Sequence, residues 1–457
     1  MKRKMENSFL SEKFYESTFD TETGTLVRQI QLEEESDRFC FGPERIIRAL
    51  FKDVVKLDEF NVLGSERDQV EKWRELFGHR TFPFSPSPET LDISITGWCN
   101  FGCAYCYQDS TVKKKHASTS LVAQVLSSFK VAPYQVAIGG GEPTSHPDFP
   151  TILVSAHELG TVPNYTTAGH IFREDVIEAT NLYCGGVALT YHAFKGIEYF
   201  RETYKKWRKA IKKQLNVHLI ADCDVASNLI QLTELQGSES IGKLNIVLLS
   251  YYPNVGRGSM ERIMPKRVYN IELPVAIKRA IDKGVNIAFS EGLLPYFFSR
   301  PEVGVSTAFA CKAEGYYSCY VDSKGQMFKS SFKANDEKPI GSLSDGDLQS
   351  KWTQGLGEDW RTSPHHDACE NGCKFQDICS IPNIHSYLTC DFAPHNAGSK
   401  KQLFTKSAER ARQKEAEGER FWALIHARDE ELGRPMTPDE IRELRAAHNI
   451  QDNEEED

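Results

Sequence analysis

Short apolar runs alternate with segments of helical pattern from residue 90 to about residue 300. These runs are predicted to be strands, at residues 91–96, 135–139, 163–167, 186–190, 216–221, 245–250 and 285–290. Alternation of strands and helices at this spacing is typical of βαβ units, which place their strands side by side in one parallel sheet. The sequence therefore predicts an α/β fold built on a parallel sheet.

A loop with three cysteines follows the first of these strands. Cys99, Cys103 and Cys106 have the spacing C-x3-C-x2-C. Three thiolates in a tight loop suit a [4Fe–4S] cluster in which one iron has no protein ligand, and an open metal site is where chemistry can occur. A zinc loop or buried thiols are the alternatives. Zinc usually takes a fourth Cys or His at short range, and only His116 follows before Glu142.

A glycine-rich turn follows the second predicted strand. Residues 136–138 lead directly into the sequence Gly139-Gly140-Gly141-Glu142-Pro143-Thr144. Glycines at the end of a strand can adopt positive φ and let the backbone approach a ligand closely. The Glu142 carboxylate can accept a hydrogen bond from an ammonium group. Such a turn alone usually marks an ordinary loop, but this one lies one strand–helix unit after the cysteines.

The two motifs together resemble those of the radical S-adenosylmethionine (SAM) superfamily. The resemblance implies a partial (β/α)6 TIM-type barrel, with the site at the carboxyl ends of the strands. It also implies that the three cysteines hold a [4Fe–4S] cluster whose open iron is chelated by SAM. The residues assigned to cofactor binding in this motif pair are Tyr105, the aromatic residue before the third cysteine, and Gly140, Gly141, Glu142 and Pro143, which match the element that binds the SAM amino group.

Further candidates lie at the ends of the other predicted strands. Thr190 matches a position where the family often places a hydroxyl that binds the SAM ribose, although a Thr there is more often part of a turn. Arg257 lies in a Gly-Arg-Gly turn that resembles one near the adenosine. Glu291 is the candidate catalytic residue, because carboxylates near reactive centres often act as bases. His192 and Asp222 share the same rim, where most polar residues only form hydrogen bonds.

A second group of cysteines comprises Cys369, Cys373, Cys379 and Cys390. Four thiolates at this spacing can hold a complete [4Fe–4S] cluster or a tetrahedral zinc ion. Their position resembles the SPASM domain, with three departures: the gap between Cys369 and Cys373 is three residues rather than two, and Asn383 and Ser330 stand where that family has cysteines. We therefore expect one auxiliary [4Fe–4S] cluster on the four cysteines, with zinc as the alternative. Cys311 and Cys319 are a vestige, a buried pair or ligands of something smaller.

The pattern of elements predicts four segments. They are an N-terminal α+β extension (1–84), with a hairpin around residues 19–27 and helices at 44–51 and 66–77; the barrel (85–300); a SPASM-like auxiliary cluster domain (301–395); and a charged helical extension (396–457).

Composition restricts the setting of the protein. No apolar stretch approaches the roughly 18 residues of a membrane span, and the first residues lack the apolar core of a secretion signal. We therefore expect a cytoplasmic protein with no membrane association, in which twelve cysteines serve as metal ligands rather than disulfides. The net charge of −9 gives no indication of nucleic-acid binding.

The resemblance also implies a reaction. An external one-electron donor, such as a flavodoxin or ferredoxin, reduces the cluster, and SAM is cleaved to methionine and a 5′-deoxyadenosyl radical that abstracts hydrogen from a substrate. Members with SPASM-like domains most often modify peptides or proteins, and smaller groups oxidise sugars or other metabolites. Two features favour a peptide substrate: residues 1–80, which could bind a leader peptide, and the basic run 204–213. A solvated helix face is the simpler interpretation of that run. A non-catalytic metal scaffold is a third class, against which both intact motifs argue.

Overall fold

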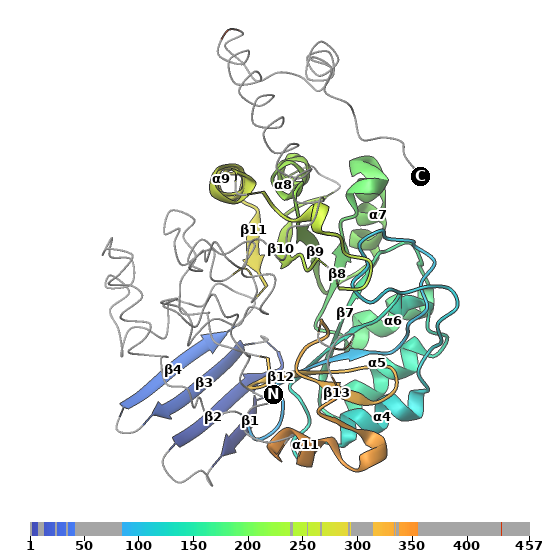
Figure 1. Cartoon of the computed structure of the whole chain (residues 1–457), viewed down its shortest axis with the longest axis vertical. Helices are drawn as coiled ribbons and strands as arrows, with labels where there is room; N and C mark the ends of the chain where they lie inside the picture. The colour runs from blue at the N-terminus through green and yellow to red at the C-terminus, as the bar shows by residue number, and fades with distance from the viewer. Residues whose placement is uncertain are drawn as a thin grey trace, which may run out of the picture. The chain divides into compact units, whose positions relative to one another are not determined.

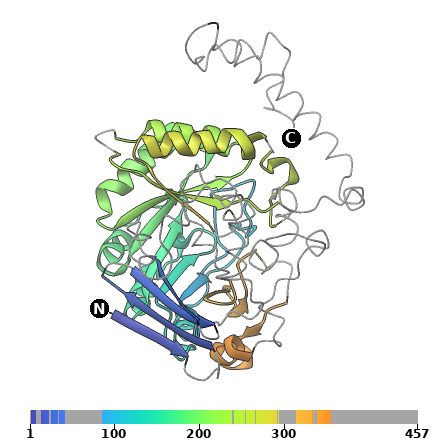
Figure 2. The same ribbon diagram turned by 90° about the vertical axis from the view of Figure 1, so that its left-hand side faces the viewer.

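The computed structural model describes residues 2–7, 13–22, 25–32, 35–41, 85–237, 241–253, 255–265, 267–290, 293, 314–332, 334, 338–354 and 431. The chain divides into two compact units, residues 1–394 and 395–457, and every described residue except Glu431 lies in the first. The first unit contains a four-stranded sheet and a ten-stranded sheet (Figures 1 and 2). Glu291, Cys311 and the four cysteines of the second group lie outside the described residues.

The N-terminal sheet is an antiparallel meander. Its strands, in spatial order, are β1 (Lys2–Asn7), β2 (Lys13–Asp20), β3 (Thr25–Leu32) and β4 (Glu35–Phe41). Asp20 pairs with Thr25, and the Asp20 carboxylate accepts a hydrogen bond from the backbone N–H of Glu22, as aspartates in turns often do. The predicted hairpin is therefore confirmed. The helices predicted at 44–51 and 66–77 lie outside the described residues.

The larger sheet contains all seven strands predicted from the alternating pattern. They are β5 (Thr90–Ser94), β6 (Gln135–Gly139), β7 (Val162–Thr167), β8 (Gly186–Thr190), β9 (Gln214–Ala221), β10 (Asn245–Ser250) and β11 (Asn286–Phe289). Each is parallel to its neighbour, in the order of the chain. The predicted ends differ by no more than two residues. The largest differences are at β5, which ends at Ser94 rather than residue 96, and at β9, which starts two residues early.

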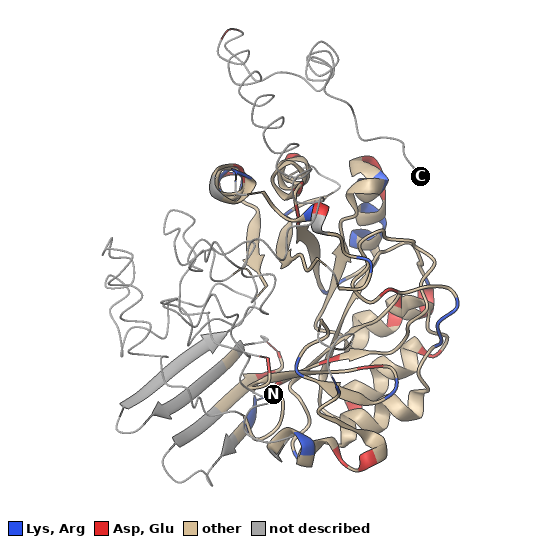
Figure 3. Ribbon diagram, in the orientation of Figure 1, with Lys and Arg blue, Asp and Glu red and all other residues tan. Residues whose placement is uncertain are grey.

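Helices cover the outer face of this sheet (Figure 1). They are α4 (Thr119–Ser127), α5 (Phe149–Glu158), α6 (Glu174–Tyr183), α7 (Gly196–Ala210), α8 (Val225–Glu234) and α9 (Leu273–Asp282). On α7, Phe200, Tyr204 and Trp207 are buried, and charged side chains occupy most of the exposed positions (Figure 3). Lys205 pairs with Glu202 on the same helix. The basic run is thus amphipathic, with its aromatic stripe in the core.

The inner face of the sheet differs from the helix-covered face. On β6, Val136 and Ile138 are buried, whereas Ala137 between them is exposed. Successive residues of a strand point to opposite faces, so Ala137 belongs to the inner face. Asp92 pairs with Ala137 in register and shares this face. Burial among the surrounding strands raises the pKa of Asp92 to about 6.

Three further strands extend the large sheet beyond β5. These are β12 (Ser318–Val321), β13 (Gln326–Phe328) and β14 (Gly341–Ser342), followed by α11 (Leu348–Gln354). β12 is parallel to β5, where Cys319 pairs with Leu91 and is only 2% exposed. The Trp352 indole donates a hydrogen bond to the Ser85 carbonyl. Described residues that the sequence assigned to a separate cysteine-rich segment therefore form part of the barrel sheet, and Cys319 lies in its core.

The N-terminal sheet contacts the barrel at the start of β6. Tyr134, the residue before β6, stacks on Phe19 at 5.2 Å between ring centroids, and its hydroxyl lies 3.0 Å from the Ser17 hydroxyl. Arg3 donates hydrogen bonds to the carbonyls of Ala132 and Pro133. These contacts lie at the amino-terminal edge of the parallel sheet. No helix of the described residues is long and apolar enough to cross a membrane.

Candidate active site

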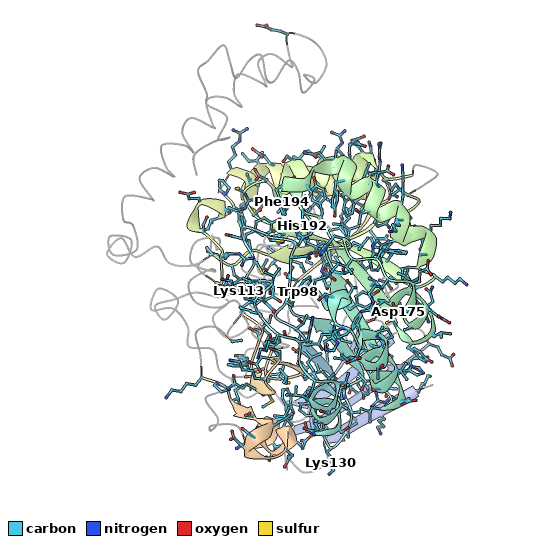
Figure 4. The ribbon with its side chains drawn as sticks, turned by 90° about the vertical axis from the view of Figure 1, so that its right-hand side faces the viewer. Trp98, Lys113, Lys130, Asp175, His192 and Phe194 are labelled. Atoms are coloured by element: carbon cyan, nitrogen blue, oxygen red, sulfur yellow. The ribbon has the colours of Figure 1, made fainter. Side chains whose placement is uncertain are left out.

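The three-cysteine loop leaves the carboxyl end of β5 and is fixed by backbone hydrogen bonds. Gly97 and Cys99 pair with residues 111–115, which return alongside the loop. Gly102 has φ of +77°, a conformation that glycine adopts without strain and that turns the chain between the first two cysteines. Figure 4 shows Trp98 and His192 well separated from Lys130, which lies toward the amino-terminal end of β6. The loop therefore occupies the edge of the sheet that the sequence predicts for the site.

All three thiols are free and half-buried. Cys99 Sγ accepts a hydrogen bond from the Phe101 N–H, and Cys106 Sγ accepts one from the Ser110 N–H, both at 3.4 Å. Burial, followed by the neighbouring thiols Cys106 and Cys99, raises the pKa of Cys103 to about 12. Binding of metal at this sulfur would therefore release a proton.

The spacing of the sulfurs suits a cluster better than a single ion. Three metal-ligand atoms lie within 4.8 Å of one another at only one place in the described residues, Asp222–Asp224, so the three loop sulfurs are spread more widely. Sulfurs on one tetrahedral zinc would be about 3.8 Å apart, given Zn–S bonds of ~2.3 Å. Free thiols with backbone N–H donors fit an iron–sulfur cluster, whose potential such hydrogen bonds adjust.

The glycine-rich turn docks on the cysteine loop. The Gly141 N–H donates to the Thr96 carbonyl at 2.6 Å, and the Glu142 N–H donates to the Trp98 carbonyl at 2.9 Å. A Cβ at Gly140 would lie 2.2 Å from the Thr96 oxygen, and one at Gly141 would lie 2.0 Å from the Trp98 oxygen. Gly140 also has φ of +122°. These glycines therefore let the turn approach the cysteine loop, rather than only a ligand as the sequence interpretation assumed.

The Glu142 side chain is 1% exposed and is held by hydrogen bonds. Its Oε1 accepts from the Thr144 hydroxyl and the Thr167 hydroxyl, each at 2.6 Å, and from the Thr144 N–H at 3.2 Å. Its Oε2 accepts from the Ala168 N–H at 2.9 Å. Pro143 begins a short 3-10 helix that Glu142 caps, which orients the carboxylate.

Two imidazoles flank the cysteine loop. The Phe101 ring lies between His170 and His192, with centroid distances of 4.8 and 4.5 Å. His192 is 8% exposed, and its Nδ1 lies 3.6 Å from Cys103 Sγ and 3.5 Å from the Tyr105 hydroxyl. Burial, together with His170 and Lys195, lowers the pKa of His192 to about 4, so the ring is neutral at neutral pH.

Arg257 contacts the cysteine loop. Its Nε donates to the Cys103 carbonyl at 3.0 Å, and its Nη1 donates to the Ser110 carbonyl and pairs with Asp109. The neighbouring Gly256 has φ of +58°, and a Cβ there would lie 2.3 Å from the Cys106 oxygen. The Gly-Arg-Gly turn thus holds the cysteine loop, and its guanidinium is directed to two carbonyls and one carboxylate of that loop.

Of the other residues proposed at the rim, Thr190 and Tyr105 lie near the cysteine loop or at a strand end, and Asp222 is part of an ion pair. Thr190 ends β8, half-buried and paired in register with His218. Tyr105 belongs to the cysteine loop, and the guanidinium carbon of Arg262 lies 5.1 Å from the centroid of its ring. Arg262 also pairs with Asp222 at 2.5 Å, so Asp222 serves an ion pair.

Three polar residues surround Glu142, and sequence reasoning assigned none of them an individual role: Thr167 was a candidate only as part of the strand end 165–169, and Thr144 and His170 were not proposed. Thr144 was within the quoted motif but was given no role, and Thr167 ends a predicted strand, so both could have been found as polar groups at strand ends. His170 had no comparable signal, because it meets Glu142 only through the fold.

Comparison with known proteins agrees with this site. The family model described as the radical SAM superfamily matches residues 93–221, which extend from β5 to β9 and contain both motifs. A three-cysteine loop and a glycine-rich turn at the carboxyl edge of a parallel partial barrel define a radical SAM enzyme. The segment that carries both motifs, residues 93–221, belongs to the radical SAM superfamily.

Individual relatives are distant. The chain is similar to mycofactocin maturase MftC of Mycobacterium tuberculosis, with 23% identity over 317 residues that cover 63% of this chain and 78% of the relative. It is also similar to the GTP 3′,8-cyclase of Pasteurella multocida, with 29% identity over 137 residues that cover 27% of this chain and 41% of the relative. The crystal structure of Streptococcus suis SuiB bound to precursor peptide SuiA matches with a TM-score of 0.56 and 14% identity, covering 72% of this chain and 77% of that chain. This match confirms the predicted partial barrel.

Proposed function

We propose that this radical SAM enzyme abstracts hydrogen from a peptide or protein substrate and thereby modifies it after translation. The observation that carries the chemistry is the docking of the Glu142 turn on the cysteine loop, through the Gly141 and Glu142 N–H groups. A buried, hydrogen-bonded carboxylate therefore lies on the turn that is joined to the loop with the three free thiols.

Each motif residue has a separate role in the proposed reaction. Cys99, Cys103 and Cys106 would hold a [4Fe–4S] cluster, which when bound with SAM supplies the electron for cleavage to methionine and a 5′-deoxyadenosyl radical. Glu142 would accept hydrogen bonds from the SAM amino group, in a buried setting where charge-assisted hydrogen bonds are strong. Arg257 would hold the loop in place through the Cys103 carbonyl.

Three observations support a peptide or protein as the substrate. One relative is a maturase, and one structural match was crystallised with a precursor peptide. The N-terminal sheet is an addition to the barrel whose outer strands, β1 and β4, each pair on one side only among the described residues. Such edges can bind an extended peptide as an added strand. A small metabolite or sugar is the alternative substrate.

The proposal is tested with anaerobically reconstituted protein, SAM and dithionite. We expect release of 5′-deoxyadenosine, which the triple Cys→Ala variant of the loop abolishes and Glu142→Gln reduces through weaker SAM binding. Peptides encoded by short reading frames beside the gene are then added, and their masses are compared with and without SAM. A peptide whose mass changes in step with 5′-deoxyadenosine supports the proposal. Unchanged peptides together with turnover of a metabolite fraction would assign the enzyme to the small-molecule class.

A further inference from the structure

His170 is held rigidly at the edge of the Glu142 pocket. It follows Gly169, whose φ of +77° redirects the chain after β7. The Gly169 carbonyl accepts a hydrogen bond from the buried Trp207 indole at 2.9 Å, and the Gly169 N–H donates to the Thr167 hydroxyl. The imidazole packs against the Phe101 ring. The position of this side chain is therefore set by α7 and by the cysteine loop.

The two nitrogens of His170 have different surroundings. Nε2 lies 2.7 Å from Asn100 Oδ1, a carbonyl oxygen that can only accept, so Nε2 carries the proton. In a neutral ring this leaves Nδ1 as an acceptor. Nδ1 is buried and has no hydrogen-bond partner among the described residues. A buried acceptor without a donor is uncommon in folded proteins and points to a group that is bound there.

The bare Nδ1 faces the Glu142 carboxylate. The distance from Nδ1 to Oε2 is 3.8 Å, which is too long for a hydrogen bond. Oε1 of Glu142 is occupied by Thr144 and Thr167, whereas Oε2 accepts from the Ala168 N–H alone among the described residues, which leaves one of its lone pairs without a donor. A nitrogen about 2.9 Å from each acceptor fits this spacing, provided that it carries at least two N–H groups.

We propose that His170 Nδ1 is a second acceptor, beside Glu142, for the amino group of SAM. This inference rests on the proposed function, because it assigns a partner to a cosubstrate of that reaction. A primary amine has enough N–H donors to serve both acceptors at once. The pair would therefore both bind the amino group and fix its orientation.

The test uses three variants that separate the two nitrogens. His170→Asn keeps a side-chain acceptor near Nδ1, His170→Gln keeps a polar group near Nε2 toward Asn100, and His170→Phe keeps only the ring that packs on Phe101. We expect the dissociation constant for SAM, measured by equilibrium dialysis of cluster-loaded protein, to rise about tenfold in His170→Phe and His170→Gln and to stay within a few-fold of wild type in His170→Asn. A SAM analogue with hydrogen in place of the α-amino group should bind all four proteins equally.

Two results would overturn the inference. The first is the reverse order, with His170→Gln near wild type and His170→Asn weak, which would mean that the residue acts through Asn100. The second is an equal loss of affinity for SAM and for the analogue. Thermal unfolding and iron content of each variant show whether the loop is intact. If wild-type protein with a full cluster bound neither compound, the proposed function itself would fail, which is a distinct outcome.

Discussion

The Nδ1 atom of His192 lies 3.6 Å from the Sγ atom of Cys103, a contact that joins a residue just after the end of β8 to a cysteine proposed as a cluster ligand. Hydrogen bonds to the sulfurs of an iron–sulfur cluster stabilise its reduced form, because they offset the added negative charge. We expect His192→Phe to shift the midpoint potential of the loop cluster to more negative values. A redox titration followed by electron paramagnetic resonance measures the shift. His192→Asn, which retains a donor near Nδ1, is the matched control, and equal potentials in all three proteins would contradict the prediction.

The glycine turn predicts opposite behaviour for two neighbouring substitutions. Gly141→Ala should displace the cysteine loop, because its Cβ would lie 2.0 Å from the Trp98 oxygen, whereas a Cβ at Gly139 meets nothing within 4 Å. We expect Gly141→Ala to lose about 1–3 kcal/mol of stability and much of its bound iron. Gly139→Ala should resemble wild type in thermal unfolding and iron content. Similar iron contents in the two variants would show that the contact between the glycine-rich turn and the cysteine loop tolerates a side chain at residue 141.

Arg257 gives a prediction about iron retention. Arg257→Gln removes the hydrogen bonds to the Cys103 and Ser110 carbonyls, so the cluster should be lost to a chelator several-fold faster. Asp109→Asn breaks only a half-exposed ion pair, which is worth little, and should leave the rate unchanged. A large loss of SAM affinity in Arg257→Gln protein that retains its full cluster would instead favour the adenosine contact that the family resemblance implies.

The metal content tests the two cysteine groups separately. Protein with two [4Fe–4S] clusters should contain about eight irons after anaerobic reconstitution. Replacing Cys99, Cys103 and Cys106 by Ala should remove half of this iron and all SAM cleavage. Replacing the four cysteines of the second group should remove the other half. Zinc at the second group, found by metal analysis of natively purified protein, would refute the auxiliary iron–sulfur cluster.

Asp92 makes stability depend on pH. Its pKa is raised from 3.8 to about 6 in the folded protein, so the native state keeps a proton that the unfolded chain releases. The free energy of unfolding should therefore decrease as pH rises from about 4 to about 6 and stay lower above that range. Asp92→Asn should stabilise the protein by about 1–3 kcal/mol at pH 7 and leave it unchanged at pH 4. Denaturant unfolding at both pH values measures this, and equal effects at both would contradict it.

The parallel sheet and the cysteine loop could be predicted because their signals are local. Alternating apolar residues define strands such as 91–95, and a strand that leads into cysteines or glycines fixes where the loop begins. β12 could not be predicted in the same way. Its four residues carry no periodic pattern, and they form a strand by pairing with β5 on one side and β13 on the other.

The roles of individual residues depended on distant contacts. Arg257 was recognised within its turn, but nothing in the sequence indicates that Cys103 provides its acceptor, since 154 positions separate the two residues. The contact between Trp207 and the His170 loop could not be predicted for the same reason, because Trp207 reaches the Gly169 carbonyl from a separate helix. Sequence alone therefore found the residues of the motifs and missed the residues that hold them in place.

The hydrogen bond from the Glu142 N–H to the Trp98 carbonyl lies one residue before the first cysteine. The turn proposed to bind SAM and the loop proposed to bind iron are therefore joined by their backbones, so a displacement of one would be transmitted to the other. A chain whose loop is displaced for lack of iron would also lose the hydrogen bond that fixes the Glu142 backbone. Such a protein would bind SAM weakly until its cluster is in place. Iron-free enzyme would then not compete with complete enzyme for the cosubstrate.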